Sequence, residues 1–230
     1  MEVIANGNTA EIYEYGNQRI CKLFYNGYPQ QYVDHEFNNA KEIWSLGIKS
    51  PEPHEIVSIN GRPGIIYDKI IGEELSDKIR NSDQETWLNR FVKFQKDLFG
   101  FHDDNLMDYK DFLKLFASGA EELLLKIDGL DNGNSVIHGD FHPSNLMVDR
   151  TGTLILIDMM NVCKGSSAYD VARTYFLLRK DKDLQKKYLE KSGYKMAEIK
   201  SYLEVILLVR EKELEAGNQR HTTQQADDLE

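Results

Sequence analysis

The sequence contains little that would place the protein in a membrane or outside the cell. It has only two cysteines in 230 residues, Cys21 and Cys163, and neither lies in a CxxC or other metal-ligand spacing. Isolated thiols are typical of buried, reduced cysteines, so we expect a cytoplasmic protein. No apolar run approaches the ~18 residues that a bilayer span needs, and the N-terminus shows no basic segment followed by an apolar one. We therefore expect neither a membrane partner nor a secretory signal.

Positive charge is also scarce. Lys and Arg number 28 against 38 Asp and Glu, which gives a formal net charge of −10. Surfaces that bind nucleic acid concentrate Lys and Arg, so nucleic acid is not an expected partner. No Walker A pattern is present, which excludes a P-loop kinase. The remaining composition, 41% hydrophobic and 29% charged residues, is that of a globular protein with one large domain or two small lobes.

The first 70 residues predict a small β-rich lobe with one helix. Apolar residues recur near every 3.6 positions over 29–46, which predicts the helix. Asn60-Gly61 stands between two strand-like runs and is the strongest hairpin signal in the chain. The β-prone runs lie at 3–5, 10–15, 19–25, 55–59 and 62–67.

Beyond a hinge near residues 68–72 the chain is expected to be mainly helical, with a second lobe over 71–216. Ser82 and Glu85 have the spacing of a helix-capping box. From residue 217 the sequence is polar, and we expect a disordered tail over 217–230. The predicted fold class is therefore α+β, with two lobes and a cleft between them. The later helices are expected at 109–127, 167–179, 182–190 and 196–215.

One segment carries the strongest chemical signal. Asp140 and Asn145 stand five positions apart between two apolar runs, and a further run over 154–157 ends on Asp158. Kinase-like enzymes use this layout, His-x-Asp-x-x-x-x-Asn and then a strand closing on Asp, to hold an acceptor hydroxyl and Mg²⁺ against a nucleotide. In this interpretation Asp140 takes the acceptor proton, while Asn145 and Asp158 bind Mg²⁺. A surface loop with incidental polar residues is the alternative.

The two histidines of this segment have different expected roles. His138 is expected to pack and hydrogen-bond so that it braces the loop. His142 either contacts a substrate or has no specific role, and the sequence leaves both readings open.

The residues His138 to Val148, with Leu154 to Asp158 and Ala168 to Arg173, resemble the aminoglycoside phosphotransferase and choline kinase superfamily. These enzymes are small-molecule relatives of protein kinases. The resemblance implies a bilobal protein-kinase-like fold and Mg²⁺-dependent transfer of the γ-phosphate of ATP or GTP. The acceptor would be a hydroxyl of a small molecule, such as an amino sugar, an amino alcohol or a related metabolite.

Carried over to the second lobe, the resemblance makes Asp140 the catalytic base and Asn145 and Asp158 the metal ligands. It makes Asp170 a structural acid that braces the catalytic loop. Residues 71–216 then form the catalytic and acceptor-binding lobe.

In the first lobe, residues 1–70, the resemblance implies nucleotide binding. Lys22, inside an apolar strand, resembles the lysine that grips the α- and β-phosphates, and Glu36 resembles its ion-pair partner. A lysine in such a strand needs a buried counter-charge, and Glu42 on the same predicted helix is the other candidate. Gly7, Asn8 and Thr9 form either the phosphate-covering loop or a generic hairpin turn, and the purine-contacting hinge is expected at Asp68 and Ile70.

The chain also departs from the family pattern. Met159-Met160-Asn161 follows Asp158 where many relatives carry another acid, which puts a second metal site of the family type in doubt. The part after Asp158 is short, so the acceptor pocket is expected to be small or open. The acidic stretch 103–108 either faces a cationic acceptor or, as we favour, is a solvated loop.

Two rival functions remain at this stage. A nucleotide-binding pseudokinase or adaptor would not need the complete set of Lys22, Asp140, Asn145 and Asp158. A protein kinase is disfavoured because Asp-Phe-Gly and Ala-Pro-Glu are both absent. The acceptor, the choice between ATP and GTP, and the oligomeric state stay open.

Overall fold

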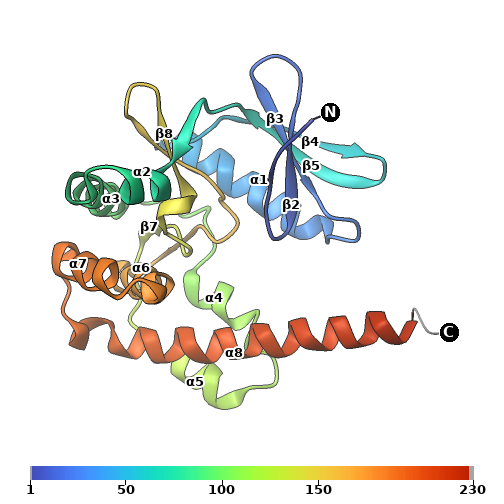
Figure 1. The fold of residues 1–230 in the computed structure, drawn as a ribbon. Coiled ribbons are helices and arrows are strands. Elements are labelled where there is room, and N and C mark those ends of the chain that lie inside the picture. Colours follow the sequence, from blue (N-terminus) through green and yellow to red (C-terminus); the bar gives the residue numbers. More distant parts are fainter. Residues whose placement is uncertain (1, 228–230) are drawn as a thin grey trace.

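The structure is a computed structural model that describes residues 2–227. Its N-terminal lobe is a five-stranded antiparallel sheet in the order β1-β2-β3-β5-β4, and α1 connects β3 to β4 (Figure 1). The predicted strands and helix are therefore present. Their bounds are β1 Val3–Asn6, β2 Ala10–Glu14, β3 Arg19–Phe24, α1 Gln30–Ser45, β4 Pro53–Ile59 and β5 Arg62–Asp68.

Helix α1 is amphipathic, and its buried face lies against the sheet. Val33, Glu36, Ala40 and Ile43 recur at helical spacing and are almost fully buried. Three of them are apolar, so burial of this face drives the packing. Glu36, 1% exposed, is the exception, and its position matters for the site.

The β4–β5 hairpin turns at Asn60-Gly61, as predicted. Both residues adopt positive φ, 53° for Asn60 and 78° for Gly61. A two-residue turn with positive φ at both positions matches the right-handed twist of the strands it joins. The turn sets the register in which Ile59 faces Arg62.

The chain enters the second lobe through the segment after β5. Here β6 (Gly72–Glu74) pairs with β8 (Leu146–Asp149), so the linker at 69–71 leads directly from the N-terminal sheet to a sheet of the C-terminal lobe. This small sheet has the order β6-β8-β9, with β9 at Leu154–Leu156. A further two-stranded sheet pairs β7 (Ser135–Ile137) with β10 (Cys163–Gly165).

Helices make up most of the C-terminal lobe, which completes an α+β fold of the predicted kind. One hydrophobic core extends from the inner face of the N-terminal sheet into these helices. None of the helices in the described part of the chain has both the length and the apolar character of a membrane span. The helices are α2 Leu75–Asn81, α3 Gln84–Leu98, α4 Tyr109–Lys114, α5 Glu121–Asp128, α6 Ser167–Leu177, α7 Lys182–Ser192 and α8 Met196–Asp227, with short 3₁₀ turns η1 Pro143–Asn145 and η2 Leu178–Lys180.

Two local predictions were wrong. The single helix expected at 109–127 is two helices, α4 and α5, because the turn residues Ser118-Gly119 interrupt the pattern. Helix α3 is capped by Asp83 and not by Ser82, and the Asp83 side chain accepts from the N–H groups of Glu85 and Thr86. The described helix α8 extends to Asp227, beyond the predicted end at residue 215. The disordered tail expected over 217–230 stays a prediction. Residues 228–230 of that tail lie outside the described residues.

Candidate active site

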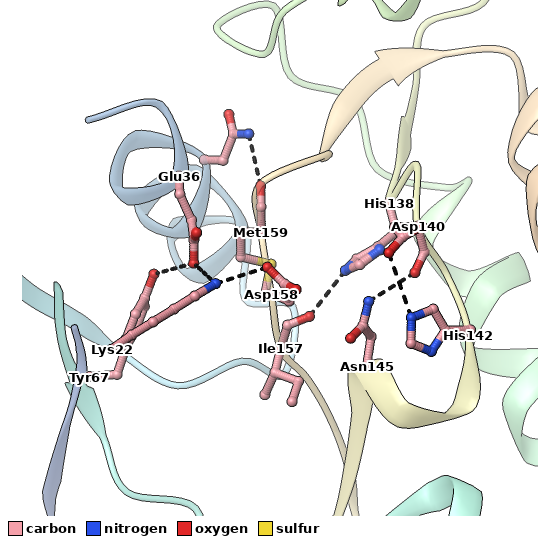
Figure 2. A network of polar contacts seen from close by, with 11 residues as sticks. Lys22, Glu36, Tyr67, His138, Asp140, His142, Asn145, Ile157, Asp158 and Met159 are labelled. Carbon is pink, nitrogen blue, oxygen red and sulfur yellow. Dashed lines mark hydrogen bonds and ion pairs between the residues drawn. The ribbon is translucent and has the colours of Figure 1, made fainter. Parts of the chain in front are cut away.

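Lys22 on β3 lies between two carboxylates that come from different parts of the chain. Its Nζ is 2.7 Å from Glu36 Oε1 on α1 and 3.0 Å from Asp158 Oδ1 in the loop after β9. Tyr67 OH also approaches Glu36 Oε1, at 3.4 Å. Figure 2 shows these side chains pointing toward one another. The structure thus selects Glu36 over Glu42, which instead contacts Asn105.

The charge of Lys22 depends on these partners. Its side chain is only 14% exposed, and burial by itself would lower the pKa of the ammonium. The negative charges of Glu36 and Asp158 outweigh burial and raise the pKa of Lys22 above its usual range. The lysine therefore stays protonated, as a group that grips phosphates must.

The catalytic-loop segment follows β7 and is held from behind by Asp170 on α6. Asp170 is fully buried; its Oδ1 accepts from the Gly139 N–H at 2.8 Å and its Oδ2 from Gln95 Nε2 at 2.9 Å. Gly139 has φ +73°, and a Cβ there would lie 2.3 Å from the Asn161 carbonyl oxygen, so no other residue fits without displacing the backbone. This places Asp170 where the sequence predicted a loop-bracing acid.

Gln95 on α3 makes the bracing network continuous. Besides Asp170, its Nε2 donates to Thr174 Oγ1 at 3.1 Å, and its Oε1 accepts from Tyr188 OH at 2.7 Å. Thr174 Oγ1 in turn donates to the Phe141 carbonyl at 2.8 Å. Because every one of these groups is buried and partnered, the network holds the loop in one conformation.

Asp140 is held between two basic side chains. Its Oδ1 lies 3.1 Å from Arg173 Nη2 on α6, and its Oδ2 lies 3.6 Å from His142 Nε2. Burial would raise the pKa of Asp140, but the interaction with His142 and the charge of Arg173 outweigh it and hold the pKa at about 2. Asp140 is thus a carboxylate over the whole neutral range and able to accept a hydrogen bond.

Asn145 and Asp158 are brought to the same region by the β8–β9 hairpin. Asn145 Nδ2 donates to the Asp140 carbonyl at 3.0 Å, and the Asn145 carbonyl accepts from the Ile157 N–H at 3.0 Å. The Ile157 carbonyl accepts from His138 Nε2 at 3.1 Å, so His138 joins the catalytic loop to the residue before Asp158 (Figure 2). Asp158 itself has φ +64°, a sparsely populated conformation for a residue other than glycine.

The remaining predicted residues lie outside this network of described contacts. Gly7, Asn8 and Thr9 form the exposed turn between β1 and β2, and Tyr25 anchors it through bonds to the Gly7 and Thr9 carbonyls. Asp68 ends β5, and its carboxylate pairs with His54 at 2.8 Å. Its side chain is therefore engaged with β4, which leaves only backbone groups of the hinge for a ligand.

Besides Gln95, sequence reasoning missed two residues that the structure connects to the site. Arg173 ends the Ala168–Arg173 segment, one helical turn after Asp170, and that spacing was the available signal. Asn39 lies one turn after Glu36 and donates from Nδ2 to the carbonyls of Met159, at 2.9 Å, and Val162, at 3.0 Å.

The acidic stretch 103–108 makes contacts within the chain. Asp108 caps α4, and Asp104 contacts Lys164.

Comparison with known proteins agrees with this geometry. The family model described as "Phosphotransferase enzyme family" matches residues 101–200, which include the catalytic loop, Asp158 and Asp170. Among curated proteins no sequence match is found. The resemblance to the aminoglycoside phosphotransferase and choline kinase superfamily is confirmed. The family match supports the predicted enzyme class, a small-molecule phosphotransferase.

Solved structures show the same fold at low sequence identity. A thermostable mutant of aminoglycoside phosphotransferase APH(4)-Ia, in ternary complex with AMP-PNP and hygromycin B, is 15% identical with a TM-score of 0.68, covering 95% of this chain and 88% of that chain. Choline kinase LicA from Streptococcus pneumoniae is 15% identical with a TM-score of 0.61, covering 94% and 87%. Aminoglycoside phosphotransferase APH(3'')-Id from Streptomyces rimosus, with ADP and streptomycin, is 13% identical with a TM-score of 0.62, covering 86% and 90%. At such identities the likeness establishes the fold, which is the predicted kinase-like one.

Removal of Lys22 should destabilise the protein strongly. Lys22→Met leaves Glu36 buried without its counter-charge, and we expect a loss of about 3–5 kcal/mol in the free energy of unfolding. The double variant Lys22→Met/Glu36→Leu should lose less, since it buries no unpaired charge. Urea unfolding of both, with the exposed Lys186→Met as control, measures this. A Lys22→Met loss no larger than that of the control would contradict the buried ion pair.

The pairing of Asp140 with Arg173 should give a pH-dependent stability. A carboxylate with a lowered pKa stabilises the fold above its unfolded pKa, about 4, and this contribution disappears as the pH falls toward the folded value of about 2. The difference in unfolding free energy between the native protein and Arg173→Met should therefore shrink as the pH falls from about 5 to about 3. Arg179→Met is the matched control, because Arg179 also stacks on Phe176 and should give a constant difference. A constant difference for Arg173→Met as well would argue against the pair.

Proposed function

We propose that this protein transfers the γ-phosphate of ATP or GTP to a hydroxyl group of a small molecule, with Mg²⁺, in the cytoplasm. The observation that carries the proposal is the convergence of two networks. Lys22, Glu36 and Asp158 form one, Asp140 and Asn145 form the other, and the His138–Ile157 hydrogen bond joins them. The free, buried Cys21 and Cys163 support a reducing compartment, and the net charge of −10 argues against nucleic acid as a partner.

The nucleotide would bind between the N-terminal sheet and the catalytic loop. Lys22 offers a positive charge for the α- and β-phosphates, and the Gly7–Thr9 turn offers a backbone cover one strand away. At the hinge, the N–H groups of Asp68 and Lys69 are already used by the Glu52 and Gln18 carbonyls. In the described structure the N–H of Ile70 has no such partner, so Ile70 is our candidate donor to the purine.

Asn145 and Asp158 fit a magnesium ion by the chemistry of their free atoms. Asn145 uses its Nδ2 for the Asp140 carbonyl and leaves its Oδ1 without a partner among the described residues. Asp158 uses Oδ1 for Lys22, leaves Oδ2 without one, and is 45% exposed on its side chain. Two oxygen donors of this kind, shared with phosphate oxygens, suit Mg²⁺. When bound, the ion would neutralise charge that develops on the transferred phosphoryl group.

Asp140 would accept a hydrogen bond from the acceptor hydroxyl and take its proton as the phosphoryl group is transferred. Its carboxylate form at neutral pH suits this role, and the bracing through Gly139 and Asp170 fixes its position. Arg173 and His142 keep the carboxylate ionised and oriented. Catalysis in this class rests mainly on such positioning and on charge stabilisation.

The acceptor class is proposed from the relatives. The solved structures that share the fold include complexes with hygromycin B and with streptomycin, and a choline kinase. These relatives support an amino sugar or an amino alcohol as the acceptor of this chain. Their AMP-PNP and ADP support a nucleoside triphosphate as the donor.

Replacement of Asp140 should abolish turnover and spare nucleotide binding. A panel of hydroxyl-bearing metabolites and aminoglycosides is screened for acceptor-stimulated release of ADP or GDP. We expect Asp140→Ala to reduce the rate by about 10³-fold or more, because the acceptor loses its base, while the nucleotide affinity changes little. No stimulated turnover by the native chain with any acceptor would instead favour the pseudokinase or adaptor.

Replacement of Asp158 tests the metal assignment separately. Asp158→Ala should remove the Mg²⁺-dependence of nucleotide binding, which calorimetric titration of ADP with and without Mg²⁺ measures. Asp183→Ala is the control, since that exposed acid pairs with Lys187 on α7 and lies outside the proposed site. If Asp158→Ala bound nucleotide with an undiminished response to Mg²⁺, the ligand assignment would be wrong.

A further inference from the structure

A second concave site lies away from the catalytic residues. A cavity of about 380 Å³ opens where α3, the loop between α1 and β4, and the start of β9 meet. None of the predicted catalytic, nucleotide-binding or metal-binding residues lines it. Its walls are largely apolar and partly aromatic, formed by Ile48, Phe94, Leu98, Phe101 and Leu154.

The polar residues of this cavity are mostly basic. Lys49, Arg90 and Lys93 line it, against the single acid Asp97, which is already paired with Lys93 at 2.6 Å. The chain has a net charge of −10, so three basic side chains around one cavity make a locally positive region on an acidic protein. A positive region of this kind attracts anions.

The basic groups differ in how they are held. Arg90 is fixed, because its guanidinium stacks on the Trp87 ring at 4.5 Å and donates to the Gly152 carbonyl. The Lys49 side chain has no ion pair or hydrogen bond among the described residues, although its backbone carbonyl is used. An ammonium without a counter-charge beside an apolar cavity is free to bind a ligand.

We propose that this cavity binds a small organic anion with a flat apolar body, such as an aromatic carboxylate or sulfonate. The aromatic walls would bury the ring, and Lys49 and Lys93 would pair with the anionic group. The volume lies within the range of small-molecule sites.

The position of the cavity couples it to the active site. The Lys49 carbonyl accepts from the Leu156 N–H at 2.8 Å, which joins the loop after α1 to β9. Helix α1 carries Glu36, and β9 ends two residues before Asp158. A ligand wedged against this junction would shift both partners of Lys22, so it would change the nucleotide affinity; this part rests on the proposed function.

The test uses naphthalene-2-sulfonate as the probe, titrated calorimetrically into the whole protein. Charge reversal in Lys49→Glu/Lys93→Glu should weaken binding by about tenfold or more, while the control Lys41→Glu/Lys186→Glu, on exposed positions outside the cavity, should change it less than about twofold. The neutral naphthalene-2-sulfonamide should bind more weakly than the sulfonate. The readout is independent of turnover, so it separates this proposal from the proposed function.

Three results would overturn the assignment of the cavity: no binding to the native protein at millimolar probe, equal affinity in the charge-reversed variant, or competition of the probe with ADP that persists in the charge-reversed variant. The coupling is tested by titrating ADP and Mg²⁺ with and without saturating probe. A changed ADP affinity in the native protein, absent in the charge-reversed variant, supports the coupling. An unchanged affinity would refute it.

Discussion

One lysine between two carboxylates unites the parts of the chain that form the site. Lys22 comes from the N-terminal sheet, Glu36 from the helix that packs on it, and Asp158 from the C-terminal lobe. A buried ammonium is unfavourable unless its charge is paired, so this contact constrains where α1 and the β9 end can lie. Asn39 adds a second constraint from the same helix, because it holds the backbone that follows Asp158.

The catalytic loop depends on a different kind of constraint, a buried polar network with no exposed member. Asp170 holds the loop backbone at Gly139. Burial makes any unpaired group in this network costly, so all of its members stay bonded together. The loop can therefore present Asp140 and Asn145 without large side-chain motion when ligands bind.

The carboxylates of the site are each paired with basic side chains. Asp140 lies between Arg173 and His142, and Lys22 lies between Glu36 and Asp158. This balance suits a reaction in which negative charge accumulates on a phosphoryl group while a proton is taken up late. The polar residues that line the proposed anion-binding cavity are also mostly basic. This cavity lies where the loop after α1 meets the start of β9.

Local pattern was enough for most of the fold and for the residues of the catalytic loop. Strand periodicity, the Asn60-Gly61 turn and the spacing of Asp140, Asn145 and Asp158 are properties of neighbouring residues. They led to the fold class that the comparisons confirm and to the phosphotransferase class that the family match supports. Only the tertiary structure decided the choice of Glu36 over Glu42 and the pairing of Arg173 with Asp140. Each depends on which side chains meet across elements far apart in the sequence. At such contacts, burial and the pairing of opposite charges outweigh local secondary-structure preferences. Neither can be read from the local sequence pattern, because both depend on tertiary contacts.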